Sequence, residues 1–221
     1  MIELKNIVKT YHTGQTEVTA LKGVSLKVAQ GEFLCVAGPS GSGKTTLLNI
    51  MGCLDRPDSG KLFLDGLQIR DMGKRRLASI RLHKIGFIFQ SFNLIPVLSV
   101  YENIEYPLLL MGVNKTERTH RVLEIIRAVG LEGLEARRPP ELSGGQQQRV
   151  AVARALVTEP LVVLADEPTA NLDHKTGQQL IELFHQQNTE RGVTFVFSSH
   201  DPEIINRASR IVRLRDGMLE E

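Results

Sequence analysis

The sequence predicts an α/β fold built on a mainly parallel sheet, and two observations lead to that fold. Short continuous apolar runs at 33–37, 161–165 and 194–198 are typical of strands buried on both faces. Helical patterns separate these runs, and strands that alternate with helices form parallel sheets covered on both sides. The 221 residues, 42% hydrophobic and 24% charged, indicate one globular domain rather than a disordered or fibrous chain.

Hydrophobic periodicity predicts the individual elements in order. The chain up to Val28 alternates in the manner of strands, which predicts an N-terminal antiparallel β subdomain. Further strands are expected at 33–37, 61–64, 85–89, 161–165, 194–198 and 211–215, and helices at 44–51 and 176–191.

Between about 91 and 142 the pattern changes to that of helices. Apolar residues recur there in steps of three or four through Val129, and Gly130 is the expected C-cap. We therefore expect a single domain over 1–221, with a core of about 1–90 and 143–221 and an inserted helical subdomain at about 91–142.

Charge, cysteine content and hydropathy exclude several classes of protein. The net charge of +2 gives no strong electrostatic case for binding nucleic acid. Cys35 and Cys53 form no C-x-x-C pair, so neither a disulfide framework nor a zinc site is expected, as in a reducing compartment. The first residues have no signal-peptide pattern, and no apolar run approaches the roughly 18–20 residues that span a bilayer. We expect a cytoplasmic chain.

The positive charge is concentrated in one segment. Residues 61–90 carry seven basic and two acidic side chains, a local charge of 7 − 2 = +5, which leaves 2 − 5 = −3 for the rest. The segment 74–84 could lie against anionic headgroups or an acidic face of a partner. A solvated helix face is the more common role for such a charge run.

A glycine-rich turn follows the strand expected at 33–37. Residues 38–45 read Gly-Pro-Ser-Gly-Ser-Gly-Lys-Thr and fit G-x-x-x-x-G-K-[ST], the phosphate-binding P-loop. Glycines allow successive N–H groups to turn inward around an anion, and the following helix adds its positive end. Lys44 is expected to reach the β- and γ-phosphates and Thr45 to ligate Mg²⁺. The nucleotide-binding residues expected here are Gly38, Ser40, Gly41, Ser42, Gly43, Lys44, Thr45 and Thr46.

Two carboxylates end the strand expected at 161–165. In a P-loop protein a carboxylate at this position holds the Mg²⁺ that bridges the β- and γ-oxygens, which assigns that role to Asp166. Glu167 follows it and can orient and deprotonate a water. An Asp-Glu pair alone is usually solvated surface charge, but the buried strand before it and the P-loop elsewhere favour the catalytic interpretation.

The segment Leu142-Ser143-Gly144-Gly145-Gln146, followed by a predicted helix, resembles the LSGGQ signature of ATP-binding-cassette (ABC) ATPases. With the P-loop and the carboxylate pair, the resemblance extends over essentially the whole chain. It implies a P-loop NTPase core and ATP hydrolysis. It also implies that Ser143, Gly144, Gly145 and Gln146 bind the ATP held by a second subunit, so that two copies dimerise head to tail around two nucleotides.

The same resemblance assigns roles to five further positions. Tyr11 resembles the aromatic residue that stacks on adenine, with Val18 beside it, although an ordinary half-buried strand tyrosine is the alternative. Gln90 resembles the glutamine that contacts Mg²⁺ and the attacking water. Asp173 resembles the aspartate that reaches across the dimer, and His200 the histidine that contacts the γ-phosphate.

The resemblance therefore implies ATP and Mg²⁺ as cofactors of an ATPase. The implied catalytic residues are Glu167, His200, Gln90 and Lys44, and the implied Mg²⁺ contacts are Thr45, Gln90 and Asp166. The implied reaction is in-line attack of water on the γ-phosphate, with most of the catalysis expected from positioning and charge neutralisation.

The segments 49–57 and 87–113 resemble the ATPases of lipoprotein release and macrolide export. That resemblance implies an integral membrane subunit as partner, no nucleic acid, and a location on the inner face of the cell membrane through that partner. The expected docking residues are Phe92, Leu94, Ile95, Pro96, Leu98 and Tyr101. The alternative is that they form the core of the helical insertion.

Two other functions compete with a transporter subunit. A soluble ABC ATPase acting on nucleic acid or ribosomes would carry a long coiled coil or a second cassette. Lys44 and Ser143 are only 143 − 44 = 99 residues apart, with no sustained heptads between them. A P-loop kinase for a small molecule leaves the LSGGQ-like segment and His200 unexplained.

Overall fold

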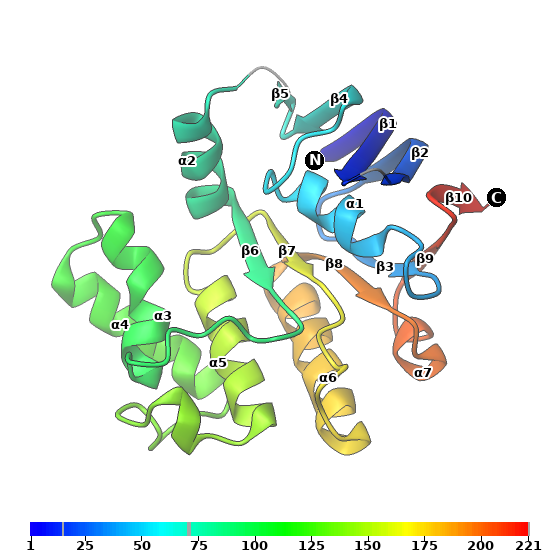
Figure 1. Ribbon diagram of the computed structural model, residues 1–221. Coiled ribbons are helices and arrows are strands. Elements are labelled where there is room, and N and C mark those ends of the chain that lie inside the picture. The colour runs from blue at the N-terminus through cyan, green and yellow to red at the C-terminus, as the bar shows by residue number, and fades with distance from the viewer. Residues whose placement is uncertain (15, 70–71, 221) are drawn as a thin grey trace.

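The computed structural model describes residues 1–14, 16–69 and 72–220, which form two sheets and the helices around them (Figure 1). The larger sheet has, in spatial order, β10 (Met218–Glu220), β9 (Arg210–Arg215), β3 (Phe33–Ala37), β8 (Thr194–Ser199), β7 (Val162–Ala165) and β6 (Ile85–Ile88). From β9 to β6 every neighbouring pair is parallel, and β10 runs antiparallel to β9. The predicted mainly parallel sheet is confirmed.

The smaller sheet is antiparallel and comes from the first part of the chain. Its spatial order is β2 (Thr16–Val28), β1 (Ile2–Thr13), β4 (Ser59–Leu64) and β5 (Leu67–Gln68). The long β1–β2 hairpin pairs Ile2 with Val28 at one end and Tyr11 with Val18 near the other. The predicted N-terminal antiparallel β subdomain is therefore present.

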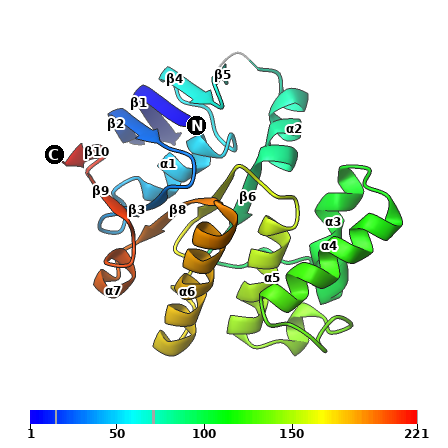
Figure 2. The same ribbon diagram turned by 180° about the vertical axis from the view of Figure 1, so that it is seen from behind.

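The larger sheet has helices on both faces, and on one of these faces a helix packs between it and the smaller sheet. Helix α1 (Lys44–Met51) lies between the two sheets, whereas α5 (Gly144–Leu156) and α6 (His174–Arg191) cover the opposite face of the larger sheet (Figure 1). The remaining helices are α2 (Lys74–Lys84), α3 (Val100–Leu110), α4 (Lys115–Ala128) and α7 (Pro202–Ile205), with a 3-10 turn at Pro139–Glu141. Helices α3 and α4 stand on the side of the molecule away from β10 (Figure 2).

The strands of the larger sheet divide their side chains between two hydrophobic clusters. On β3, Phe33 and Cys35 belong to the cluster that includes α3 to α6, whereas Leu34 and Val36 belong to the cluster with α1 and the smaller sheet. Successive strand residues point to opposite faces, so a run of apolar residues fills both clusters. All five residues of β3 are buried, as the continuous apolar run predicts.

Every strand expected from 33 onward, and the helices expected at 44–51 and 176–191, are present with bounds that differ by at most two residues. The strand expected at 211–215 is not the last one, however, because β10 follows it. Strands β5 and β10 each follow a two-residue Asp-Gly turn, Asp65-Gly66 and Asp216-Gly217, in which both residues have positive φ. Asp-Gly is a strong hairpin signal, and these two hairpins were predictable from it.

The expected helical stretch from 91 to 142 is helical only in part. Residues 91–99 form an irregular loop, in which Phe92 (φ +61°) and Asn93 (φ +49°) have backbone angles that an α-helix does not allow. The buried Asn103 holds this loop by donating from Nδ2 to the carbonyls of Ile95, Leu98 and Ser99. The periodicity of α4 is confirmed, but its C-cap is Val129, and Gly130 with φ +68° follows one residue later.

The basic segment 61–90 contains helix α2. Its first-turn side chains Lys74, Arg75 and Arg76 are exposed, whereas Lys84 lies 2.9 Å from Asp65. Arg70 and Asp71, which belong to this segment, lie outside the described residues. No helix in the described ranges is long and apolar enough to cross a membrane.

Candidate active site

The P-loop joins β3 to α1 and forms a cradle of backbone amides. Gly43 has φ +105°, and a Cβ there would lie 2.5 Å from the carbonyl oxygen of Ala20, so this position requires glycine. Gly43 is also the N-cap of α1 and supplies no side-chain cap, and the first turn of α1 contains no acidic residue. The first amides of α1 are therefore open to an anion at the positive end of the helix, which fits a phosphate group.

Lys44 lies inside this loop and is almost fully buried, with 7% of its side chain exposed. Its ammonium donates to the carbonyl oxygens of Gly38 (2.8 Å) and Pro39 (3.0 Å) and lies 3.4 Å from Glu167 Oε1. A buried ammonium needs such partners, because an unpaired charge away from water is costly. The lysine is thus held at the cradle, beside the carboxylate that follows β7.

Glu167 occupies a left-handed backbone conformation (φ +46°) after the end of β7. The hydroxyl of the buried Ser198, on the neighbouring strand β8, accepts from the Glu167 N–H (2.8 Å) and donates to Asp166 Oδ1 (2.7 Å). A single hydroxyl can act as donor and acceptor at once. Ser198 therefore ties both carboxylate residues to the sheet.

His200 directly follows β8 and also contacts the Glu167 carboxylate. Its Nδ1 is 3.0 Å from Glu167 Oε2 and 3.1 Å from Oε1, and 67% of its side chain is exposed. The structure thus brings three of the four predicted catalytic residues into one contact chain, from Lys44 through Glu167 to His200.

Lys44, Glu167 and His200 all line one cavity of about 360 Å³. It is lined by Tyr11, Ala20, Ser40, Gly41, Gly43, Lys44, Thr45, Thr46, Gln90, Glu167, Ala170 and His200. Ten of these twelve were predicted from the sequence. Of the other predicted P-loop residues, Gly38 lines a neighbouring cavity and Ser42 is buried, with a hydroxyl that has no partner among the described residues.

Tyr11, which lines the cavity, and Val18 lie near the end of the β1–β2 hairpin. They are directly paired across the hairpin, so their side chains share one face of the sheet. Their exposed fractions are large for apolar residues, 38% for Tyr11 and 54% for Val18. An aromatic ring and a branched apolar side chain in this position offer a flat apolar surface beside the phosphate cradle.

The oxygen-bearing side chains near the cradle suit Mg²⁺ that is shared with the phosphates, rather than a metal whose ligands all come from the protein. No cluster of three or more His, Cys, Asp or Glu that could hold a metal is found among the described residues. Mg²⁺ is usually bound through one or two carboxylates together with substrate phosphates. Thr45 and Gln90 line the cavity, and Asp166 directly precedes Glu167, so these three oxygen-bearing side chains suit such a shared site.

The LSGGQ-like residues lie elsewhere. Ser143 is the N-cap of α5, where its Oγ accepts from the Gln146 N–H (3.3 Å) and its own N–H donates to Gln146 Oε1 (2.9 Å). None of Ser143, Gly144, Gly145 and Gln146 lines the cavity. Asp173 is likewise absent from the lining. It caps its own helix, α6, by accepting from the N–H and the hydroxyl of Thr176.

Several residues at the site were not among the site residues predicted from the sequence. Ser198, Ala20 and Ala170 reach it from β8, β2 and the segment after β7. Asn171 donates from Nδ2 to the carbonyl oxygen of Gln90 (2.9 Å) and so links the two segments that flank the cavity. Their partners are distant in sequence, so only the fold reveals them.

A P-loop at the carboxyl end of an interior strand of a parallel sheet, with a buried lysine and a glutamate–histidine pair, defines the class of P-loop nucleoside triphosphatases. Comparison with known families places the chain within that class. The ABC transporter family model matches residues 21–170. The chain therefore belongs to the ABC transporter family.

Relatives match over the full length. An uncharacterized ABC transporter ATP-binding protein of Thermotoga maritima is 50% identical over 220 residues, which cover 100% of this chain and 94% of that protein. The lipoprotein-releasing system ATP-binding protein LolD of Geobacter metallireducens is 45% identical over 98% of this chain and 96% of that protein. The macrolide export ATP-binding/permease protein MacB of Syntrophobacter fumaroxidans is 47% identical, and this chain spans only 31% of it.

Solved structures agree with the family. The ATP-binding cassette MJ0796 of Methanocaldococcus jannaschii, solved as a dimer in a post-hydrolysis state with ADP and Pi, has a TM-score of 0.93 and 45% identity. The match covers 100% of this chain and 97% of that one. This protein is an ABC ATPase that binds and hydrolyses ATP.

Proposed function

We propose that this chain is the ATP-hydrolysing subunit of a membrane transporter or of a mechanical transmitter, and that two copies close head to tail around two Mg-ATP to drive a separate membrane protein. One observation carries this proposal: the chain has both a phosphate cradle and the LSGGQ-like helix end, yet the helix end does not line the cavity. Each copy therefore lacks half of a complete site.

The chemistry follows from the contacts around Lys44. When the γ-phosphate enters the cradle, Lys44 exchanges its contacts with Gly38, Pro39 and Glu167 for the phosphate oxygens. Glu167 is then free to accept a proton from the attacking water at its carboxylate, and His200 remains within reach of that carboxylate and of the cavity. The cradle amides and Lys44 stabilise the negative charge in the transition state.

Mg²⁺, when bound, supplies neutralisation of charge on the β- and γ-oxygens. Thr45, Asp166 and Gln90 would hold it. Ser198 keeps the Asp166 carboxylate in place through its 2.7 Å hydrogen bond, as partners of metal ligands commonly do.

The helix end at Ser143 is suited to a phosphate of the other copy. Helix α5 has no acidic residue in its first turn, and the N–H groups of its first residues, Gly144 and Gly145, have no partner within the helix. Its exposed N-cap serine can offer a hydroxyl in addition. Asp173 lies at the start of the neighbouring helix α6, where it can contact the second copy.

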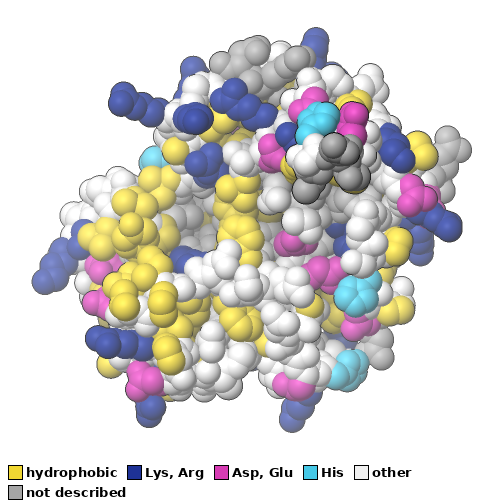
Figure 3. Space-filling view, viewed as in Figure 1, with side chains coloured by type: hydrophobic (Ala, Val, Ile, Leu, Met, Phe, Trp, Pro, Cys, Tyr) yellow, Lys and Arg dark blue, Asp and Glu magenta, His cyan; other side chains and the backbone are white. Residues whose placement is uncertain are grey.

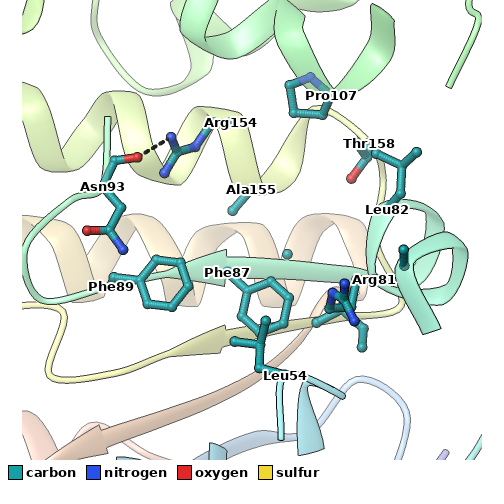
Figure 4. Close-up of a pocket in the computed structure, with 13 residues that line it drawn as sticks. Leu54, Arg81, Leu82, Phe87, Phe89, Asn93, Pro107, Arg154, Ala155 and Thr158 are labelled. Carbon is teal, nitrogen blue, oxygen red and sulfur yellow. Dashed lines mark hydrogen bonds between the residues drawn. The ribbon is translucent and has the colours of Figure 1, made fainter. Parts of the chain in front are cut away.

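A membrane subunit would dock around β6 and α3. A cavity of about 430 Å³ there is lined by apolar side chains including Leu54, Phe87, Phe89 and Pro107, together with Arg81 and Arg154 (Figure 4). Arg154 donates to the carbonyl oxygens of Phe92 and Asn93 (2.9 and 2.6 Å), so it holds the loop that follows Gln90.

Exposed apolar side chains also lie on α3 and in the loop before it. Val97 is 69% exposed, Leu110 58%, Leu109 45% and Tyr106 42%, and hydrophobic side chains gather over α3 and α4 in Figure 3. Of the docking residues expected from the sequence, Pro96 is exposed, Phe92, Ile95 and Leu98 are half-buried, and Leu94 and Tyr101 pack against the core. The apolar patch therefore extends further along α3 than the sequence predicted.

The relatives support a separate membrane partner. MacB is by name an ATP-binding and permease protein, and this chain corresponds to 31% of it. LolD, which this chain matches over nearly its whole length, is by name the ATP-binding protein of a releasing system. We propose that a second polypeptide supplies the permease here and keeps this chain at the inner face of the membrane, without nucleic acid. Among the described residues between the P-loop and α5, helices α2, α3 and α4 have only 11, 11 and 14 residues, too few for the long coiled coil of a nucleic-acid-acting relative.

Glu167→Gln tests the catalytic and dimer parts of the proposal. The amide cannot accept the proton of water, so turnover should fall by about 100-fold or more. ATP binding should persist, and the variant should elute as a dimer with Mg-ATP. Steady-state turnover and size-exclusion chromatography measure these outcomes, with Glu182→Gln, an exposed carboxylate on α6, as control. Near-normal turnover of Glu167→Gln contradicts its role as base.

Docking is tested by affinity purification of the tagged chain from a detergent extract of its native cells. An integral membrane protein should co-purify, and Leu109→Glu with Leu110→Glu should abolish its recovery without loss of ATPase activity of the isolated chain. Recovery that is unaffected by these substitutions contradicts docking at α3.

A further inference from the structure

The phenol of Tyr11 is fixed by a residue that is distant in sequence. Its hydroxyl donates to Asp55 Oδ2 at 2.7 Å. Asp55 lies in the loop after α1, the helix that begins at the P-loop, and the N–H of Arg56 donates to its other oxygen, Oδ1, at 2.7 Å. The ring at the mouth of the cavity is therefore tied to the far end of the helix whose beginning forms the phosphate cradle.

Lys9 supports the same ring from another direction. It lies two residues before Tyr11 on β1, so both side chains are on one face of the strand. Its ammonium lies 5.1 Å from the centroid of the Tyr11 ring and 3.1 Å from Asp55 Oδ1, and it donates to the Arg56 carbonyl oxygen at 2.9 Å. Only 12% of the Lys9 side chain is exposed. A cation over a ring at this distance is attracted to its face.

We propose that Asp55 and Lys9 are positioning residues for the nucleobase: they hold the Tyr11 ring with one face covered by the ammonium and leave the opposite face to stack on the base of the bound nucleotide. This inference rests on the proposed role of Tyr11 as the base-stacking residue. A ring that is held before the ligand arrives loses little conformational freedom on binding, and the saved entropy appears as affinity.

Asp55, Tyr11 and Lys9 stabilise one another's ionisation states. Burial opposes ionisation of Asp55, but hydrogen bonds from Tyr11, Lys9 and the Arg56 N–H outweigh it and lower the pKa of the carboxyl group. Burial, followed by the hydrogen bond to Asp55, raises the pKa of Tyr11. The carboxylate stays charged and the phenol stays protonated at neutral pH, which is the state that the hydrogen bond between them requires.

The same loop contains a matched control. Asp58 Oδ2 accepts from the Thr10 N–H at 2.7 Å, and Asp58 Oδ1 lies 3.5 Å from the Lys9 ammonium. Asp58 therefore ties the same loop to the same strand and pairs with the same lysine, but it bonds the backbone next to Tyr11 rather than the phenol. Removing it tests whether loss of a loop contact alone explains an effect of Asp55.

The experiment compares two ligands by calorimetry on the full chain with Mg²⁺ present: ADP, which has a base, and inorganic pyrophosphate, which has none. Asp55→Ala should weaken ADP binding by about 3- to 10-fold, the equivalent of one hydrogen bond, and leave pyrophosphate binding unchanged. Asp55→Asn, whose amide oxygen still accepts from the phenol, should recover most of the ADP affinity. Asp58→Ala should leave the ratio of the two affinities unchanged.

Tyr11→Ala separates this inference from the proposed function. It should weaken ADP binding by about 5- to 150-fold, as removal of a base-stacking aromatic does. If Tyr11→Ala has that effect and Asp55→Ala does not, the positioning role is overturned and the stacking role stands. If Tyr11→Ala leaves ADP affinity unchanged, both are overturned. Equal weakening of ADP and pyrophosphate by Asp55→Ala, or an equal effect of Asp58→Ala on their ratio, overturns the positioning role alone.

Discussion

Glu167 shows how a single residue is held in an unfavourable conformation at the site. Its φ of +46° is uncommon for a residue with a Cβ. Such a conformation costs on the order of 1–3 kcal/mol and persists only where the surroundings hold it. Here the Ser198 hydroxyl accepts the Glu167 N–H, and the Ala170 N–H donates to the Glu167 carbonyl oxygen at 3.1 Å. The strain places the carboxylate between Lys44 and His200.

Ser198→Ala should both destabilise the protein and weaken its response to Mg²⁺. The change leaves the Glu167 N–H without its partner and removes a hydrogen bond from Asp166, so the free energy of unfolding should fall by about 1–3 kcal/mol. Because Asp166 is then less well oriented, the Mg²⁺ concentration for half-maximal ATP binding should rise, on the order of 10-fold. Denaturant unfolding and Mg²⁺ titrations of nucleotide binding measure the two effects.

Ser209→Ala is the matched control for Ser198→Ala. Its hydroxyl donates to the Phe33 carbonyl oxygen at 2.9 Å, away from the carboxylates. It should lower the stability without changing the Mg²⁺ requirement. An unchanged Mg²⁺ requirement in Ser198→Ala contradicts the positioning of Asp166 by this hydroxyl.

Residues within a contiguous motif were predictable, and residues that act through a distant partner were not. Lys44, Glu167 and His200 each follow a buried apolar strand in a pattern with a chemical purpose, and all three meet in the structure. Ser198 and Asp55 carry no such pattern. Their partners lie 31 and 44 residues away, and only the pairing of strands and the return of the chain bring them together.

Among the elements, the P-loop turn requires glycine to different degrees along its length. Gly41 has φ +78°, and a Cβ added there would have nothing within 4 Å, whereas a Cβ at Gly43 would meet the Ala20 carbonyl oxygen at 2.5 Å. Gly41→Ala should therefore cost about 1–2 kcal/mol for its left-handed backbone.

Gly43→Ala should cost more than Gly41→Ala, because the clash with β2 adds to the backbone strain. Thermal unfolding of the two variants measures the difference in stability. Nucleotide binding should be weakened more by Gly43→Ala than by Gly41→Ala. Equal destabilisation of the two variants would mean that β2 moves away freely, contrary to the close packing of the P-loop against it.

Helix α5 has a capping box that also presents the Ser143 hydroxyl to solvent. Ser143→Ala should cost about 1 kcal/mol of stability, as other serine N-caps do. It should lower turnover more than it lowers the affinity of the monomer for ATP, because in the proposed dimer the hydroxyl contacts the nucleotide of the second copy. Turnover at saturating ATP and monomer affinity by calorimetry test this expectation.

Ser99→Ala on α3 is the control for Ser143→Ala, because Ser99 and Glu102 form the same capping box there. It should cost similar stability and leave the turnover of the isolated chain unchanged. If Ser143→Ala reduces monomer affinity as much as turnover, the proposed contact with the second copy is wrong.

For the whole molecule, the two cysteines report on opening of the core. Cys35 and Cys53 are 0% and 5% exposed. Burial, with the nearby charge of Glu167, raises the pKa of Cys35 to about 12, and burial raises the pKa of Cys53 to about 11. The reactive thiolate is therefore scarce at pH 7 in the folded state, and both thiols should label slowly unless the protein opens.

Nucleotide binding should slow this labelling further. ADP with Mg²⁺ at 100 times its Kd stabilises the folded state by about 2.7 kcal/mol, so labelling that needs global opening should slow by about 100-fold. A thiol reagent followed over time, with and without ADP, measures the rate, and the denatured protein gives the reference for free thiols. Fast labelling that ADP does not change would contradict burial of the reacting cysteine in the cooperative core.

The strand runs, the helix pattern and the P-loop were sufficient to predict the α/β class, the parallel sheet and the nucleotide cradle, because each depends on residues that are neighbours in the chain. Backbone angles, face alternation and loop chemistry act over a few residues, and the sequence carries that information directly. The two Asp-Gly hairpins were readable by the same local rule.

Tertiary packing alone determined which distant groups meet. The small net charge of the chain does not reveal which residues meet or stay exposed. Lys44 is buried against Glu167 and Asp55 holds Tyr11, whereas Val97 and the outer face of α3 are left exposed. These contacts depend on how two sheets and their helices fit together, which is a property of many residues at once. The same packing leaves the helix end at Ser143 away from the cavity of its own chain, and that separation is the physical reason to expect a second copy.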